Sequence, residues 1–407
     1  MDIFDCIIIG AGPAGLFCGA SITFGEPKRI LILEKNQTAG KKLLISGSGR
    51  CNITHTGNTA DFLKHYEEGA SFMKPAFSAF SNETLIGFLH DSGIPTEVMD
   101  NGKVFPSSMN SQDVLSVLLR ATEKNNCVIK YNEAVIHITS GDELFEVSTK
   151  QTSYASKSIV IAAGGASYIR TGSNGDSYRF VESLGHPIRE ISPALTHFLI
   201  KNYKFQSLAG VSIPAARCSV LREGRAKAKG IGDVLFTHTG LSGPGVLDLS
   251  RSAAKGDTFC FSLIPMKQDE FTNDFITRSR SEGKKSLLGF LKNYGLPESL
   301  AHAVLSYLSV DSAKHVSEVS KNERKNLAAA LCGMSFEIDE KGGWDSAMVT
   351  TGGASIEHVN SKTMESRLVP GLYIIGEALD IDGASGGYNL QACFSTGFLA
   401  AQSIGKV

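Results

Sequence analysis

Six residues near the start of the chain have the pattern of a phosphate-binding loop for a dinucleotide. Residues 10–15 read GAGPAG, which is a GxGxxG sequence. The first glycine permits a tight turn, the second lets backbone N–H groups approach a pyrophosphate, and the third lets a helix pack closely on a strand. The N-terminus of that helix adds unpaired N–H groups and a partial positive charge. The pattern predicts cofactor contacts from Gly10, Gly12, Pro13, Ala14 and Gly15.

An acidic residue stands where a ribose-binding carboxylate is expected. Glu34 follows the apolar run 29–33 and lies 19 residues after Gly15. A carboxylate at the end of this second strand accepts hydrogen bonds from an adenosine ribose with a free 2′-hydroxyl, as in FAD or NAD. The apolar run 4–9, a helix over 16–24 and the run 29–33 predict the strand–helix–strand unit that this chemistry needs. A purely structural glycine turn is the alternative.

The following segment favours FAD over NAD. Residues 40–52 combine glycine and serine with lysine and arginine. An NAD dehydrogenase would normally continue into another crossover at this point, whereas a Gly/Ser loop with cations predicts a second approach to phosphate or to the flavin ring. A flexible surface loop with ordinary lysines is the alternative.

Three segments far along the chain complete the predicted cofactor site. Residues 159–165 and 371–377 each read as an apolar strand that ends in small residues, which suits a chain crossing close beneath a dinucleotide. Glu377 is predicted to hydrogen-bond the ribityl chain of FAD. Residues 383–392 read as a glycine turn before an apolar C-terminal helix, whose N-terminus would stabilise the negative charge of the reduced flavin. A core helix with a glycine entry is the alternative.

With these blocks, the sequence resembles the bacterial three-domain FAD-binding flavoprotein family that includes aminoacetone oxidase and 3-oxo bile-acid Δ4/Δ6 reductases. The resemblance covers nearly the whole chain. Its most specific motifs are GRCN at 49–52, FTHTGLSGP at 236–244, VTTGG at 349–353 and GGYNLQ at 386–391. One departure is Glu377, where many related flavoproteins carry Asp.

The resemblance implies noncovalent FAD and a set of residues that hold it. Besides Gly10–Gly15 and Glu34, the set spans the second loop, two strand ends and the C-terminal helix. Its members are Lys35, Lys42, Ser46, Gly47, Gly49, Arg50, Cys51, Asn52, Val135, Ala163, Gly164, Gly165, Gly376, Glu377, Gly386, Gly387, Tyr388, Asn389, Leu390 and Gln391.

The predicted fold class is α/β with insertions. The resemblance implies a Rossmann-like FAD-binding domain of glutathione-reductase-type topology, made of residues 1–190 and 345–407. Strand-like stretches broken by glycines predict an inserted β-barrel-like domain over 191–264 and 326–344. Leucines at helical spacing predict a small helical domain over 265–325.

Composition and charge argue against several kinds of partner and site. Lys and Arg number 40 against 41 Asp and Glu, a formal net charge of −1, so we expect neither a nucleic-acid nor a membrane partner. No two of the eight cysteines have CxxC spacing, so we expect no metal site and no disulfide framework. We see neither a signal peptide nor an apolar run long enough to span a bilayer, and expect a cytoplasmic protein. The oligomeric state is left open.

Two residues are candidates for catalytic proton transfer. His238 lies in a turn-rich segment, and Tyr388 lies beside the predicted flavin helix. A hydrogen-bonded core histidine is the alternative for His238. Cys51 has no partner cysteine within sequence range, so no redox disulfide is expected there.

The predicted activity is hydride transfer between a small organic substrate and N5 of FAD. We favour a reductase slightly over an oxidase. The sequence has no second GxGxxG after a strand, so a nicotinamide donor, NADH or NADPH, would bind transiently at the flavin face. An amine oxidase that uses O₂ is the alternative direction. A FAD-dependent tRNA-modifying protein and a non-catalytic flavin-binding protein are the alternatives from other classes.

Overall fold

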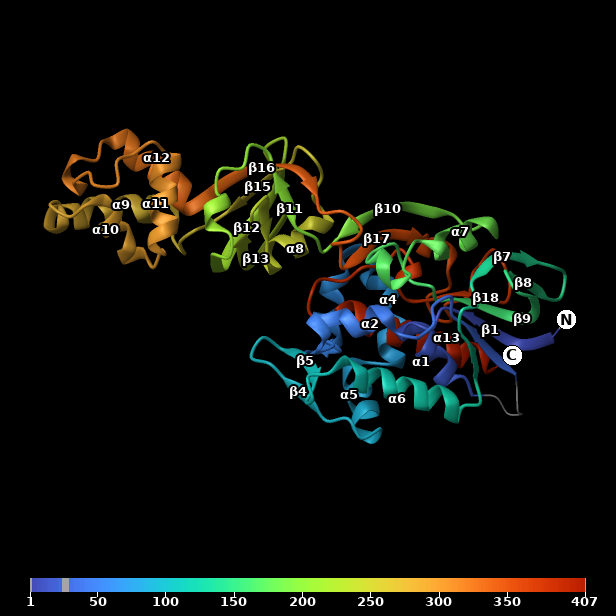
Figure 1. The fold of residues 1–407 in the computed structure, drawn as a ribbon. Helices are drawn as coiled ribbons and strands as arrows, with labels where there is room; N and C mark the ends of the chain where they lie inside the picture. Colours follow the sequence, from blue (N-terminus) through green and yellow to red (C-terminus); the bar gives the residue numbers. More distant parts are fainter. Residues whose placement is uncertain (1, 24–28, 407) are drawn as a thin grey trace. The chain divides into compact units, whose positions relative to one another are not determined.

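The chain forms two compact units in a computed structural model that describes residues 2–23 and 29–406. The first unit comprises Met1–Pro193 and Met348–Val407, and the second comprises Ala194–Ala347 (Figure 1). The first unit is therefore assembled from both ends of the sequence. Its boundaries lie within a few residues of those predicted for the Rossmann-like domain.

A seven-stranded sheet forms the centre of the first unit, in the order β6-β2-β1-β9-β8-β7, with β18 also paired to β9. The pairs β2–β6, β1–β2, β1–β9 and β9–β18 are parallel, and β7 and β8 add an antiparallel edge. This topology confirms the predicted Rossmann-type α/β fold. The strands are β1 (Asp2–Ile9), β2 (Ile30–Leu33), β6 (Val128–Lys130), β7 (Val135–Ser140), β8 (Phe145–Thr149), β9 (Ser153–Ile161) and β18 (Leu372–Ile374).

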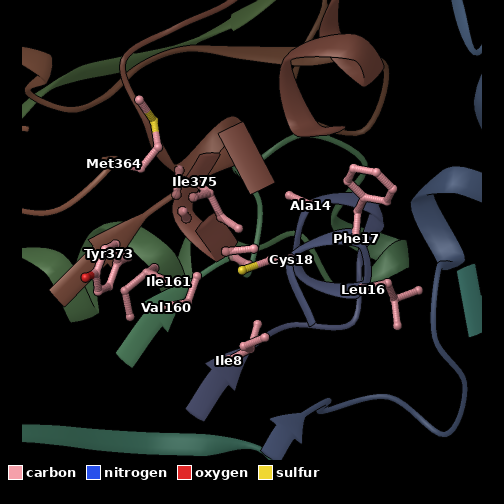
Figure 2. Close-up of a cluster of buried hydrophobic side chains, with 14 of the residues drawn as sticks. Ile8, Ala14, Leu16, Phe17, Cys18, Val160, Ile161, Met364, Tyr373 and Ile375 are labelled. Atoms are coloured by element: carbon pink, nitrogen blue, oxygen red, sulfur yellow. The ribbon is translucent and has the colours of Figure 1, made fainter. Parts of the chain in front are cut away.

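The apolar runs explain why these strands are parallel and central. All four residues of β2 are buried, as are the last four residues of β1. Strands without a polar face must be covered on both sides, which is the environment of a parallel sheet between helices. Figure 2 shows side chains of β1, the first helix, β9 and β18 meeting in one buried cluster.

Helix α1 (Pro13–Ser21) packs against the C-terminal helix α13 (Tyr388–Ile404). It begins three residues before the predicted start, because a proline at the first helical position fits the fixed φ of that residue. The predicted end at Phe24 lies outside the described residues. A Cβ on Gly397 of α13 would lie 2.7 Å from the carbonyl oxygen of Ala14, so the two helices are close enough to require glycine there.

The predicted Gly/Ser loop begins with a short helix and continues as a tight turn. Residues Lys41–Ile45 form helix α2, and Ser46–Gly49 form the 3₁₀ turn η1. The other helices of this unit are α3 (Thr59–Leu63), α4 (Ala70–Ala79), α5 (Asn82–Asp91), α6 (Ser111–Lys124) and α7 (Asp176–Ser183). Its remaining strands are β3 (Thr54–His55), β4 (Thr96–Val98), β5 (Lys103–Pro106), β10 (Ile188–Ala194) and β17 (Val349–Ala354).

The second unit holds a closed six-stranded barrel in the order β11-β14-β13-β12-β15-β16, as the sequence predicts. Its strands are β11 (Phe198–Ile200), β12 (Ser212–Arg222), β13 (Arg225–Phe236), β14 (Gly240–Ser242), β15 (Thr258–Phe261) and β16 (Met334–Lys341). Its helices are α8 (Pro244–Leu247), α9 (Gln268–Glu282), α10 (Leu287–Leu291), α11 (Glu298–Tyr307) and α12 (Lys321–Gly333). One hydrophobic cluster joins barrel and helices, so their separation into two domains stays a prediction.

The contact between α1 and α13 predicts a strong effect of side-chain size at Gly397. We expect Gly397→Val to destabilise the protein by about 1–3 kcal/mol, because the side chain would overpack a helix interface. Gly87→Ala in α5 is the matched control, since no atom lies within 4 Å of its would-be Cβ. Gly87→Ala should leave the free energy of unfolding unchanged or raise it slightly. Urea unfolding followed by circular dichroism would measure both, and equal effects would contradict the packing argument.

The buried imidazole of His186 predicts a loss of stability in acid. Burial lowers the pKa of His186 below its ordinary value of 6.5, and its side chain is 1% exposed. Above pH 6.5 both folded and unfolded chains hold it neutral and the full stability is present. As the pH falls below 6.5, the unfolded chain takes up the proton first, so stability declines. Melting temperatures at pH 8 and pH 5 should differ less in His186→Gln than in the wild type, and an unchanged difference would refute this assignment.

Candidate functional site

The candidate site lies along the carboxyl edge of the parallel sheet. Strand pairing places Leu33, Ile9, Ile161 and Ile374 in one row, and each is the last residue of its strand. The segments that leave this row are those in which the sequence predicts cofactor contacts: Gly10–Gly15, Glu34–Lys35, Ala163–Gly165 and Gly376–Glu377. Ligands of open α/β sheets bind outside this edge. The sheet therefore brings four distant motifs together.

The glycine loop after β1 has room for a phosphate at one glycine and none at the other two. A Cβ on Gly10, whose φ is +105°, would lie 2.6 Å from the carbonyl oxygen of Ala162. A Cβ on Gly15 would lie 2.0 Å from the carbonyl oxygen of Gly10. A Cβ on Gly12 would have no neighbouring atom within 4 Å, and no side chain caps α1 at this position. The uncapped N–H groups and the open space beside Gly12 fit a pyrophosphate.

Glu34 is 7% exposed and holds the loop with its carboxylate. One carboxylate oxygen accepts a 2.9 Å hydrogen bond from the backbone N–H of Ala11. The other accepts from the backbone and side-chain nitrogens of Asn36, at 2.8 and 2.7 Å. A carboxylate has about four lone-pair positions, so an acceptor remains for a ribose hydroxyl. The backbone N–H of Glu133 donates to the carbonyl oxygen of Glu34, which brings the start of β7 at Val135 toward this end of the site.

Glu377 joins three separate segments. Its carboxylate lies 2.7 Å from the ammonium group of Lys42 on α2. The other carboxylate oxygen accepts from the backbone N–H of Thr350 at 2.9 Å and from the Ser167 hydroxyl at 3.0 Å. Gly165 must lack a side chain here, because a Cβ would lie 2.4 Å from Thr350 Oγ1. This half-buried pair gives the site a fixed carboxylate and a fixed cation.

The turn η1 has an unusual backbone. Gly47, Ser48 and Gly49 have φ values of +56°, +59° and +85°, and Cys51 follows at +61°. Left-handed conformations at Ser48 and Cys51 each cost of order 1 kcal/mol and are concentrated at functional sites. Burial raises the pKa of the Cys51 thiol to about 12, so this cysteine stays protonated at neutral pH. Arg50 is exposed, with its guanidinium carbon 5.3 Å from the ring centre of Phe105.

Helix α13 begins where the chain passes close to β3. Gly387 stands at the N-cap position directly before the helix and has a φ of +100°, and no side chain caps the helix there. A Cβ on Gly387 would lie 2.5 Å from the backbone of Thr54. Asn389 closes the preceding loop through hydrogen bonds to Gly383. Gln391 is fully buried, and its amide bonds to Thr54 and to the neighbouring core. Its side chain therefore supports the helix from inside.

Tyr388 stands in a box of aromatic rings. Its ring stacks on His65 with a centroid distance of 4.0 Å and on His55 with a centroid distance of 5.2 Å. Phe62 meets it edge-on at 4.7 Å, and the Tyr66 hydroxyl donates to its backbone carbonyl. This packing fixes the first turn of α13. The catalytic role of Tyr388 stays a prediction.

His238 lies in the second unit, on the turn between β13 and β14. Its side chain is exposed, so the alternative of a core histidine is wrong. Its role in proton transfer stays a prediction.

Sequence reasoning missed four residues that the fold brings into the site. Ser167 and Thr350 bind the Glu377 carboxylate, and His55 and His65 stack on Tyr388. Thr350 had a signal, since it belongs to the VTTGG motif. The two histidines had none, because only tertiary packing brings their rings to Tyr388.

Metal and membrane features are lacking in the parts of the chain that the structure describes. No group of three potential metal-ligating side chains occurs in residues 2–23 or 29–406. All eight cysteines are free. No helix within the same residues has the length and apolarity to cross a membrane.

The sheet, its edge loops and α1 define an FAD-binding Rossmann domain of the oxidoreductase class. Residues 4–403 match the HI0933-like protein Rossmann domain, and the chain belongs to that family. This confirms the resemblance stated above and the FAD-dependent oxidoreductase class. The nicotinamide donor stays a prediction.

Three relatives span almost the whole chain. It is 28% identical to the ribosomal RNA dihydrouridine synthase of Escherichia coli strain K12, over 99% of this chain and 98% of that protein. It is 29% identical to the protein of the same name from Haemophilus influenzae, over 98% of each. It is 27% identical to a 3-dehydro-bile acid delta(4,6)-reductase of Clostridium scindens, over 97% of this chain and 98% of that protein.

The fold is also seen in a more distant flavoenzyme. A 3-ketosteroid delta1-dehydrogenase from Sterolibacterium denitrificans superimposes with a TM-score of 0.53 over the full length of both chains. The two sequences are 12% identical, so the likeness concerns the fold alone.

The open space at Gly12 predicts that a methyl group there selectively weakens FAD binding. We expect Gly12→Ala to change the stability of the FAD-free protein by about 1 kcal/mol or less, because the methyl group meets no protein atom. Affinity for FAD should fall by about tenfold or more, since the methyl group occupies the phosphate approach. Gly15→Ala is the contrasting variant and should destabilise the FAD-free protein itself. Fluorescence titration with FAD and melting of the FAD-free proteins would separate the two effects, and unchanged FAD affinity in Gly12→Ala would contradict the assignment.

Proposed function

We propose that this protein is a FAD-dependent reductase of a carbon–carbon double bond conjugated to a carbonyl group. The observation that carries the proposal is the full-length likeness to relatives whose names describe this chemistry. Dihydrouridine is uridine with its ring double bond saturated, and that bond is conjugated to a carbonyl. The Δ4 bond of a 3-oxo bile acid has the same relation to its ketone. A shared reaction class accounts for both kinds of relative.

Conjugation explains why such a bond accepts hydride. The carbonyl withdraws electrons, so hydride adds to the β carbon and a proton adds to the α carbon. Bound FAD would supply the hydride once a reductant has reduced it. The chain supplies position: the Gly10–Gly15 loop for the pyrophosphate, Glu34 for the ribose, and η1 with α13 for the flavin portion. The uncapped N-terminus of α13 is suited to stabilising the negative charge of a reduced ring.

The reaction needs a reductant, and we propose NADH or NADPH. The sequence has no second GxGxxG after a strand, so the nicotinamide would bind transiently. We propose His238 and Tyr388 as the candidate proton donors.

The acceptor that we would test first is uridine in ribosomal RNA, because two of the three relatives carry that activity in their name. A small conjugated ketone is the second candidate, and it would be a small organic substrate of the kind that the sequence predicts. It is supported by the bile-acid reductase and by the near-zero net charge of the chain.

We expect the purified protein to bind FAD and to lose its flavin absorbance at about 450 nm under anaerobic NADH or NADPH. Addition of a uridine-containing ribosomal RNA transcript, or separately of a 3-oxo-Δ4 bile acid, should restore the absorbance. The product should show the mass gain of two hydrogens by mass spectrometry of the nuclease digest or the steroid. Gly12→Ala, tested with limiting FAD, is the control for flavin dependence.

Two results would overturn the proposal. Flavin that neither nicotinamide reduces, together with O₂ consumption on addition of an amine such as aminoacetone, would establish the oxidase direction. Flavin that responds to no donor or acceptor would favour a non-catalytic protein.

A further inference from the structure

The hairpin of β12 and β13 (Figure 1) is rich in positively charged residues. Residues 217–231 contain five cations and one carboxylate, a local net charge of +4 in a chain whose net charge is −1. All five cationic side chains are exposed. We call this set the cationic hairpin; its members are Arg217, Arg222, Arg225, Lys227 and Lys229.

Strand register explains why these side chains face solvent. Cys218 and Val220 are buried on the inner side of β12, and their cross-strand partners on β13 are Gly230 and Ala228. Lys229 pairs with Ser219 on the outer side. The register shifts between Val220 and Leu221, so β13 has an extra residue at Lys227. Such a bulge re-aims side chains and is frequent beside functional surfaces.

The charge of the cationic hairpin is largely unpaired. Across the described residues, no carboxylate forms an ion pair with Arg225, Lys227 or Lys229. Arg217 donates to a backbone carbonyl, that of Met266. Among the five cations, Arg222 forms an ion pair with a carboxylate, that of Asp257, at 2.8 Å.

Compensation from the neighbouring strands is limited to Asp257, which directly precedes β15 and interacts with Arg222 and, more weakly, with Lys227. Lys229 pairs with Ser219 on β12, and Ser219 pairs in turn with Cys260 on β15. Neither Ser219 nor Cys260 carries a charge. Opposite charges on adjacent strands would stabilise the sheet, and this pattern does not use them. The turn carboxylate, Glu223, is the one acid within residues 217–231. The arrangement gives little to the stability of the barrel, so an external anion is its natural counterpart.

We propose that the cationic hairpin binds the phosphate backbone of RNA. Lys229 lies on the outer face of the hairpin, and beyond the bulge at Lys227 Arg225 pairs with Arg222 near the turn. The exposed cations therefore gather around the turn end of the hairpin, where an extended polyanion can contact several of them. Each contact with a phosphate releases a condensed counterion and strengthens binding at low salt. Arginines add bidentate hydrogen bonds to phosphate oxygens. Ile231, opposite Arg217, is 74% exposed and extends the surface with an apolar contact.

The choice of RNA among polyanions rests on the proposed function, because uridine in ribosomal RNA is the acceptor proposed above. The geometry of the hairpin is independent of that choice. The sequence expectation of no nucleic-acid partner relied on the net charge of the chain, which conceals this local excess.

Fluorescence anisotropy with a labelled oligouridylate of about 20 nucleotides would test the proposal. The variant replaces Arg225, Lys227 and Lys229 with Gln in the full-length FAD-bound protein. We expect its affinity to fall by about tenfold or more at about 50 mM salt. The slope of log affinity against log salt should become shallower by about 2, from about 0.7 for each lost contact with a single strand.

A charge-matched control removes three cations elsewhere in the same unit. Lys284, Lys321 and Lys325 are exposed on its helical part, and their replacement with Gln should leave RNA affinity unchanged. A second test variant, Arg225→Lys with Lys227→Arg and Lys229→Arg, keeps the charge and should bind as the wild type does. Flavin absorbance and the rate of reduction by NADPH should be the same in every variant, which checks the fold.

The outcomes separate this inference from the proposed function. Loss of RNA affinity confined to the Gln variant of the cationic hairpin supports it. No binding by the wild type, or equal loss in the charge-matched control, overturns it even if the protein reduces a 3-oxo-Δ4 bile acid. Conversely, hairpin-dependent binding with no dihydrouridine product would keep the RNA surface and reject uridine as the acceptor.

Discussion

One close approach holds the candidate site together, between the loop that leaves β1 and the loop that leaves β9. Parallel pairing puts Ile9 beside Ile161, and Gly10 then turns with a left-handed φ of +105° directly against Ala162. A side chain at Gly10 would collide with that backbone. Because the turn is this tight, α1 starts at the sheet edge with its N–H groups uncapped. The phosphate end of the cofactor site therefore depends on a contact that only glycine allows.

The same constraint recurs where the two ends of the chain meet. Gly397 lets α13 lie against α1, and Gly376 brings the end of β18 within contact of Ala14. The site is complete only when residues 348–407 have packed onto residues 1–193 within the first unit. The ion pair of Lys42 with Glu377 then links elements from opposite ends of the sequence inside that interface.

Charge is distributed differently in the two units. Within the site, the carboxylate of the Lys42–Glu377 pair accepts hydrogen bonds on both oxygens, so the pair contributes position and little net field. On the barrel, the cationic hairpin is exposed and mostly unpaired. The net charge of −1 is a sum over the whole chain, so it shows neither the paired charges of the site nor the local positive excess of the hairpin. A reductase that accepts a base within a polyanion would need both a neutral, ordered pocket and a separate charged contact surface.

The sequence by itself determined the features that depend on neighbouring residues. Continuous apolar runs required buried parallel strands, and the glycine turn after β1 indicated that a helix follows, although its start at Pro13 came three residues earlier than predicted. Glu34 could be placed because its spacing follows from one strand–helix–strand unit. Only the tertiary structure decided that the side chain of Gln391 faces the core and that Tyr388 stacks between two histidines. Those outcomes depend on contacts between residues distant in sequence, which local pattern does not encode. The placement of the cationic hairpin likewise followed from strand pairing in the barrel and its register shift, which bring residues 217–222 beside 225–231.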